Sequence, residues 1–181
     1  TGFLAIAGLW AGPWLREVAG LSAPAAASWL SLVAIGLMAG FFGFGVIASR
    51  AGGPARIWRI FMIGSFAYCA VIVAIIVLPP SVAPPLWIPF AMLSSGGILT
   101  FSVVTNLFDE GLAGRVNTTI NCLIFILSFL VQWLFGVVVG LFPMDDWGGS
   151  RVGYQVALAG LLGLHLLSYL PLAVRGGRRP A

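Results

Sequence analysis

The chain has 181 residues, of which 60% are hydrophobic and 8% are charged, and its mean hydropathy is +1.07. Nine basic and five acidic side chains cannot cover the apolar surface of a soluble domain of this length, so the composition excludes a soluble protein. The net charge of +4 comes from short clusters of arginine between long apolar runs, which is typical of membrane topology and argues against a nucleic-acid partner.

Six apolar runs follow one another, separated by short segments rich in Gly, Pro and charged residues. They cover approximately residues 1–15, 27–49, 57–78, 86–107, 116–142 and 153–174. The last five are long enough to cross roughly 30 Å of hydrocarbon as helices, whereas the first reaches only about 22 Å and reads as a helix whose start is missing. The sequence therefore predicts a single transmembrane domain over residues 1–181, an all-α bundle of about six helices with the first truncated.

The arginines alternate between the two sides of the predicted membrane. The second loop, the fourth loop and the tail hold Arg50, Arg56, Arg59, Arg115, Arg175, Arg178 and Arg179. The opposite loops hold only Arg16 and Arg151, together with three of the five acidic residues. By the positive-inside rule, this bias predicts a cytoplasmic C-terminus in an integral membrane protein surrounded by the lipid bilayer.

The loop after the second run, "GVIASRAGGPAR", resembles a signature of major facilitator superfamily transporters. Its Gly45, Arg50 and Gly52 match the G-x-x-x-D-R-x-G-R-R pattern that the family carries between the second and third helices of each half. Ser49 stands where the family has its acid, and in the second half of such transporters this signature is often degraded.

The loop between the fourth and fifth runs, "FDEGLAGRVNTT", is similar to the family's acid-x-x-x-Gly-Arg segment through Glu110, Gly114 and Arg115. "GLWAGPWLREVAGLS" and "VGYQVAL" also look like the end of the first and the start of the sixth helix in the C-terminal half of bacterial members. The resemblance therefore spans nearly the whole chain. It implies the C-terminal six-helix half of a permease of the bacterial cytoplasmic (inner) membrane, whose partner is a missing N-terminal six-helix half. Such a permease carries a small solute by secondary active transport and alternating access.

Polar side chains on the fourth and fifth runs follow the periodicity of a helix, at about 100° per residue. They are Ser95, Ser102, Asn106, Asn117, Asn121, Ser128 and Gln132. The residues on each run form one stripe along the helix. Such a stripe either lines a polar route for a substrate or seals the contact between two halves, or its side chains make hydrogen bonds between helices of the bundle. For the serines we favour hydrogen bonding, because a helical hydroxyl also bonds the preceding turn. For the amides both interpretations stay open.

The family resemblance assigns these stripes to helices, because the first and fourth helices of a half line the central cavity while the second and fifth pack against the other half. The substrate-cavity candidates that it implies are Trp10, Trp14, Ser95, Ser102 and Asn106. The inter-half interface candidates are Asn121, Ser128 and Gln132. The two tryptophans fit an aromatic belt slightly better than a cavity. Because the cavity candidates are uncharged, we do not expect this half alone to neutralise a strongly charged substrate.

A cytoplasmic gate is predicted from the charges at one membrane face. Glu110 follows a helix C-terminus, where the helix dipole disfavours an anion, and Arg50, Arg56 and Arg115 lie on the same side. We expect Glu110 to pair with one of them in one conformation, although a solvated ion pair of about 0 to 1 kcal/mol explains the same charges. The gate and loop motif comprises Gly45, Arg50, Gly52, Glu110, Gly114 and Arg115.

Catalytic chemistry has no basis in the pattern. No acidic or basic residue lies deep in an apolar run, no nucleophile accompanies a base, and no phosphate-binding glycine loop occurs. Cys69 and Cys122 have no metal-ligand spacing. His165, the titratable group near the middle of the sixth run, is expected to be neutral and hydrogen-bonded to a neighbouring helix. We therefore predict no enzyme activity, no catalytic residue, no cofactor and no metal.

Two other functions fit the same composition. The chain can be a complete small integral membrane scaffold or assembly protein without transport activity, or a homodimeric half-transporter. The N-terminus discriminates between them and the permease, because a complete protein is expected to begin with Met or with a processed polar end. The chain begins inside an apolar run, which favours a fragment of a transporter.

Overall fold

The structure, a computed structural model, describes residues 4–99, 110–142 and 151–169. These residues form helices and contain no strand. The helices are α1 (Leu4–Glu17), α2 (Ala23–Arg50), α3 (Pro54–Val77), α4 (Trp87–Ser94), α6 (Ala113–Gly140) and α7 (Arg151–Leu167). Three short 3₁₀ turns accompany them: η1 (Pro84–Leu86) before α4, η2 (Ser95–Gly97) after it, and η3 (Glu110–Leu112) before α6.

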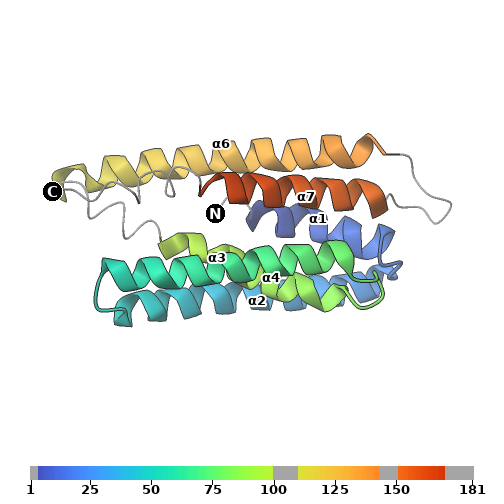
Figure 1. The fold of residues 1–181 in the computed structure, drawn as a ribbon, viewed down its shortest axis with the longest axis horizontal. Coiled ribbons are helices and arrows are strands. Elements are labelled where there is room, and N and C mark those ends of the chain that lie inside the picture. The colour runs from blue at the N-terminus through green and yellow to red at the C-terminus, as the bar shows by residue number, and fades with distance from the viewer. Residues whose placement is uncertain (1–3, 100–109, 143–150, 170–181) are drawn as a thin grey trace.

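The helices lie along the long axis of an elongated bundle, and successive helices run in opposite directions (Figure 1). α2, α3 and α4 pack together on one side, and α6 lies along the opposite edge. α7 connects the two sides, because it contacts both α6 and α3. α1 contacts α2, α4 and α6. The predicted helical runs are confirmed in the described residues, apart from an interruption in the fourth.

Local sequence explains where the long helices begin. Ser22 caps α2, because its hydroxyl oxygen accepts a hydrogen bond from the Ala25 amide at 3.4 Å, and Pro24 occupies the first turn, where its missing N–H costs nothing. The chain reverses between α2 and α3 through Gly52, whose φ of 70° lies in the left-handed region. A side chain at this position would be strained, which is the physical reason for a glycine here.

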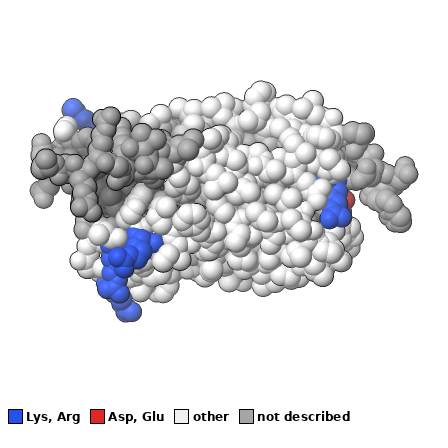
Figure 2. Space-filling view, viewed as in Figure 1, with Lys and Arg blue, Asp and Glu red and all other residues white. Residues whose placement is uncertain are grey.

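Among the described residues, three helices are long and apolar enough to cross a membrane: α2, α3 and α6. The shorter α7 is also apolar. Figure 2 shows the charged side chains of one face gathered at the two ends of the bundle, with a wide uncharged zone between them. This arrangement is that of an integral membrane protein, because charges avoid hydrocarbon while apolar side chains enter it.

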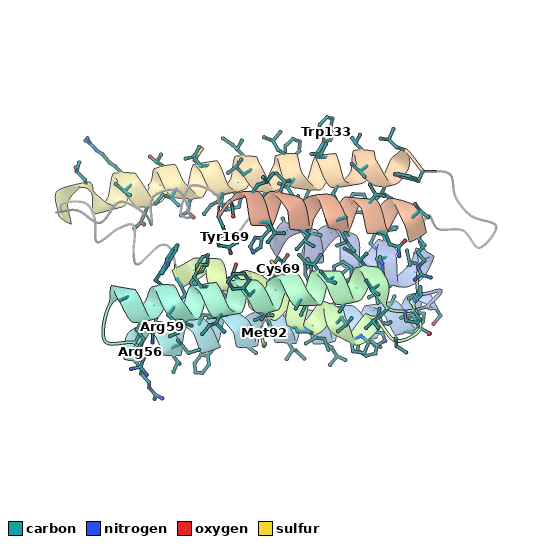
Figure 3. The ribbon with its side chains drawn as sticks, viewed as in Figure 1. Arg56, Arg59, Cys69, Met92, Trp133 and Tyr169 are labelled. Atoms are coloured by element: carbon teal, nitrogen blue, oxygen red, sulfur yellow. The ribbon has the colours of Figure 1, made fainter. Side chains whose placement is uncertain are left out.

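The arginines occupy the ends that their alternation predicts. α2 ends at Arg50, α3 carries Arg56 and Arg59 in its first two turns, and α6 carries Arg115 in its first turn. These helix ends meet at one end of the bundle, where Figure 3 labels Arg56 and Arg59. The opposite end holds Glu17 of α1 and Arg151 of α7.

The core of the bundle is built from aromatic side chains around α4. Trp87 and Phe90 are completely buried, and their rings lie 5.0 Å apart. Trp14 of α1 packs on Trp87 at a centroid distance of 5.7 Å, and Tyr68 of α3 packs on Phe90 at 5.0 Å. Tilted aromatic pairs at these distances stabilise a core beyond their area alone. α4 is therefore held between α1 and α3 by one continuous group of rings.

A hydrogen bond joins α7 to the end of α1. The Tyr154 hydroxyl donates to the Glu17 carboxylate oxygen Oε2 at 2.7 Å. We expect Tyr154→Phe to lower the free energy of unfolding by about 1.5 to 3 kcal/mol, because a hydrogen bond to a charged group is lost from a buried position. Unfolding of the purified protein in detergent micelles measures the loss. Glu17→Gln, which keeps an acceptor oxygen, is the control and should lose less; equal stability of Tyr154→Phe and the parent would contradict the prediction.

Candidate functional site

A cavity of about 300 Å³ lies among α3, the junction of α4 with η2, and the end of α7. It is lined by Phe44, Trp58, Phe61, Gly64, Ser65, Tyr68, Leu93, Ser94, Gly96, Gly97, His165, Ser168 and Tyr169. We call it the α4-break pocket. Its volume is at the lower end of the range of about 300 to 1,000 Å³ that ligand pockets occupy.

One face of α3 forms the longest wall of the α4-break pocket. Trp58, Phe61, Ser65 and Tyr68 are separated by three, four and three residues, so they lie on one side of the helix. Ten residues of helix span about 15 Å. The wall therefore runs from the arginine-rich end of the bundle toward its middle.

Three polar side chains meet at this wall. The Ser65 hydroxyl lies 2.8 Å from Nε2 of His165, and it also contacts the Tyr169 hydroxyl. The Tyr169 hydroxyl lies 3.3 Å from the same imidazole nitrogen. Figure 3 shows Tyr169 in the space between α7 and α3. These contacts join α3 to α7 through a polar cluster of Ser65, His165 and Tyr169.

Aromatic rings hold the histidine of this cluster in place. The Tyr68 ring meets the His165 ring edge-on at a centroid distance of 5.3 Å, and the Tyr169 ring does so at 5.4 Å with an interplanar angle of 90°. Edge-to-face contacts of this kind are favourable and fix the orientation of both rings. The imidazole is thus positioned by α3 and by the turn that follows α7.

The opposite wall is the break in α4, which its residues explain. Ser94 and Ser95 turn their hydroxyls back to the carbonyl oxygens of Ala91 and Met92, at 2.8 and 2.7 Å. Serines that bond the preceding turn bend helices, and the two glycines that follow have low helix propensity. The backbone tightens into the 3₁₀ turn η2 at this point. Such a turn inside a helical run often marks a hinge or a functional site.

Phe44 of α2 closes the pocket between its two walls. Its ring lies 3.6 Å from the position that a Cβ atom on Gly64 of α3 would occupy, and 3.2 Å from the corresponding position on Gly96 of η2. A side chain on Gly64 would only touch the ring, whereas one on Gly96 would crowd it. A single buried ring therefore touches the backbone of α3 and the interrupted part of α4 together.

Three of the substrate-cavity candidates belong to the described residues, and none of the three lines the α4-break pocket. Ser95 is buried against Gly40 of α2, and its neighbour Ser94 lines the α4-break pocket in its place. Trp14 is buried in the aromatic core. Trp10 packs on Phe135 of α6 at a centroid distance of 5.3 Å. Ser102 and Asn106 lie outside the described residues.

The interface candidates occupy α6. The Gln132 amide donates a hydrogen bond to the Ala5 carbonyl of α1 at 2.6 Å. Hydrogen bonding between helices of the chain was one of the two interpretations that the sequence allowed for this amide. Asn121 is exposed and Ser128 is half-buried. Trp133 projects away from the bundle and is 60% exposed (Figure 3). The structure thus brings Gln132 to α1, and it does not bring the three candidates into one site.

The gate and loop motif lies at the arginine-rich end. Gly45 and Arg50 are exposed on the last turns of α2, and Gly114 and Arg115 are exposed at the start of α6. The backbone of Glu110 belongs to η3, but its side chain lies outside the description. The pairing of Glu110 with an arginine therefore stays a prediction.

Sequence reasoning gave the correct interaction for His165 but not the site around it. The expected hydrogen bond to a neighbouring helix is confirmed by Ser65 of α3. Ser65, Tyr68 and Tyr169 were not singled out, and neither was the pocket that they line. The available signals were the spacing of polar and aromatic residues along α3 and the "SSGG" segment within an apolar run.

The chemistry of the α4-break pocket favours reversible binding. In the ranges that the structure describes, no group of three or more His, Cys, Asp or Glu side chains is arranged to hold a metal ion. Hydroxyls, an imidazole and aromatic rings are instead suited to bind a small molecule by hydrogen bonds and ring contacts.

A second cavity of about 360 Å³ lies between α6 and α7 and is lined only by aliphatic and aromatic side chains and one glycine. Its position and lining fit a lipid acyl chain better than a polar solute.

Comparisons with models of protein families, with curated proteins and with solved structures found no match for the chain.

Proposed function

We propose that this chain is the C-terminal six-helix half of a major facilitator superfamily permease, which carries a small solute across the bacterial inner membrane by alternating access. The loop signatures around Arg50 and Arg115 support the family, and the arginine-rich end would then face the cytoplasm. One structural observation carries the transport function: α4 is interrupted at Ser95–Gly97 beside a pocket that contains a polar cluster. Interrupted helices beside midplane sites are characteristic of secondary transporters.

The cost of polar groups in hydrocarbon strengthens this proposal. Ser65 and Ser94 are less than 9% exposed, and Ser65 lies near the middle of α3, one of the helices long and apolar enough to cross a membrane. Polar groups held in a membrane interior are expensive and commonly mark the path of a solute. Bonding between helices explains the Ser65–His165 contact alone, but not the cavity beside it or the break in α4.

Alternating access makes a prediction that needs no knowledge of the solute. In a background with Cys69→Ala and Cys122→Ala, we expect Ser94→Cys to react with a membrane-impermeant thiol reagent from either side of sealed vesicles. The physical reason is that a carrier opens its pocket to each side in turn. Labelling of right-side-out and inside-out vesicles, quantified by mass spectrometry, measures the access.

Ile63→Cys is the matched control, because residue 63 is 64% exposed on α3, a helix that the resemblance assigns neither to the cavity nor to the contact between halves. Lipid should shield this cysteine from a charged reagent on both sides. A scaffold protein without transport activity would leave Ser94→Cys unreactive or reactive from one side only. That result would contradict the proposed function.

A further inference from the structure

We propose that the α4-break pocket binds a small uncharged ring compound that carries a hydroxyl or N–H donor. This inference rests on the proposed function, because it names the class of solute that the permease would carry. It depends on three properties of the pocket: the absence of charge from the part of its lining that the structure describes, the rings around it, and the accepting capacity of the polar cluster.

The lining of the pocket contains no Asp, Glu, Lys or Arg side chain among the described residues. A charged solute that left water for this site would lose its hydration without gaining a counter-charge, which is costly. An uncharged solute avoids that loss. The lining therefore selects against formal charge.

Rings form most of the remaining surface. Trp58 and Phe61 have centroids 5.5 Å apart on α3, and Tyr68 and Tyr169 both meet the His165 ring edge-on. Phe44 covers the α4 side. Aromatic walls favour stacked or edge-to-face contacts with another ring over contacts with a flexible chain. A compound with one or two rings fits a cavity of about 300 Å³.

The polar cluster is suited to receive a donor. A hydroxyl carries one donor hydrogen and two acceptor lone pairs. Ser65 and Tyr169 contact one another and the same imidazole nitrogen. Their hydroxyl hydrogens are therefore used in hydrogen bonds within the cluster, while lone pairs remain on both oxygens. A ligand O–H or N–H can therefore donate to either oxygen without breaking the cluster.

A cationic amine is the strongest competing ligand, because rings also attract cations. The electrostatics of the arginine-rich end oppose it. Arg56 and Arg59 flank Trp58 on α3, and the two are labelled at that end in Figure 3. Positive charges at this end of the bundle lower the local concentration of a cation. Together with the uncharged lining, this favours the neutral compound.

Photolabelling of the full chain in lipid nanodiscs tests the class of ligand. Three probes share one trifluoromethyl-diazirine phenyl ring and differ in the group that it carries: a neutral hydroxymethyl group in the benzyl alcohol, an anionic carboxylate in the benzoate and a cation in the benzyltrimethylammonium ion. We expect the alcohol to label pocket residues of α3 and α7 saturably, with competition by excess benzyl alcohol. Labelling of the lipid-facing side of α6 should be non-saturable and reports partition into the bilayer. Peptide mapping by mass spectrometry separates the two.

Ser65→Ala should lower the saturable labelling about fivefold, because one hydrogen-bond partner of the ligand is removed. The matched control is Ser31→Ala, whose exposed hydroxyl bonds only the Ala27 carbonyl of its own helix at 3.1 Å. Ser168→Trp, at an exposed position that lines the pocket, should abolish the labelling by filling space and keeps the test valid if Ser65→Ala does not fold.

Equal labelling of the pocket by either charged probe would overturn the inference, and so would non-saturable labelling by the alcohol. The outcome is separable from that of the transport test. Saturable labelling in a protein whose Ser94→Cys is reached from one side only would uphold the ligand class and reject transport. Access from both sides without saturable labelling would reject the ligand class and uphold transport.

Discussion

Replacing Gly40 by valine is expected to lower the free energy of unfolding by about 3 kcal/mol or more. A Cβ atom at this position would lie 2.9 Å from the Met92 Cα atom, and closer still to the Met92 carbonyl oxygen and the Ser95 hydroxyl. Two of these atoms belong to the backbone, so α2 and α4 would have to separate. Unfolding of the purified variant in detergent micelles measures the effect.

Gly43→Val is the control for this prediction, because it lies on the same helix with no atom within 4 Å of the added Cβ. It isolates the contact with α4 from the intrinsic propensity of valine in a helix. If the Gly40 and Gly43 variants are equally stable, the close approach of α2 and α4 is not a determinant of stability.

A second large effect is expected at Gly136 of α6. A Cβ atom there would lie 2.7 Å from Cζ2 and 2.9 Å from Cη2 of Trp10 on α1. We expect Gly136→Val to be destabilising by about 1 to 3 kcal/mol, because an added side chain forces the indole out of its place. The obstructing atoms belong to a side chain, so Trp10→Leu in the same protein should restore part of the stability.

A double-mutant cycle tests this compensation. The coupling energy between Gly136→Val and Trp10→Leu should be about 1 to 3 kcal/mol in the stabilising direction, since the residues are in direct contact. Gly140→Val combined with Trp10→Leu is the control, because no atom lies within 4 Å of a Cβ on Gly140. Additive losses in the Gly136 cycle would show that the two residues do not constrain one another.

The long helices could be predicted from sequence because each depends on a local property. α2, α3 and α6 lie within a few residues of the apolar runs at 27–49, 57–78 and 116–142. Helix formation in hydrocarbon satisfies the backbone within the segment, so composition and length suffice. The gathering of arginines at one end of the bundle could be predicted as well, because arginine-rich and arginine-poor loops alternate along the chain.

The α4-break pocket could not be predicted in the same way. Its polar cluster joins Ser65 to His165 and Tyr169, which are about one hundred residues further along the chain. No periodicity records which helices become neighbours. Ser94 and Ser95 point about 100° apart around the helix axis, and the break at η2 helps to set which of the two faces the pocket. The pattern of one helix showed both serines but not the partner of either.

The lengths of α2 and α6 have a consequence for the membrane itself. Each helix has 28 residues and is therefore about 42 Å long, whereas the hydrocarbon layer measures roughly 30 Å. The difference is accommodated by tilt, by local thickening of the bilayer, or by ends that reach into the headgroup layer. Arg50 and Arg115, at the last and first turns of these helices, would then reach the headgroup layer, where anionic lipids attract basic side chains. Bilayer thickness and lipid charge thus become variables that act directly on the conformation of the protein.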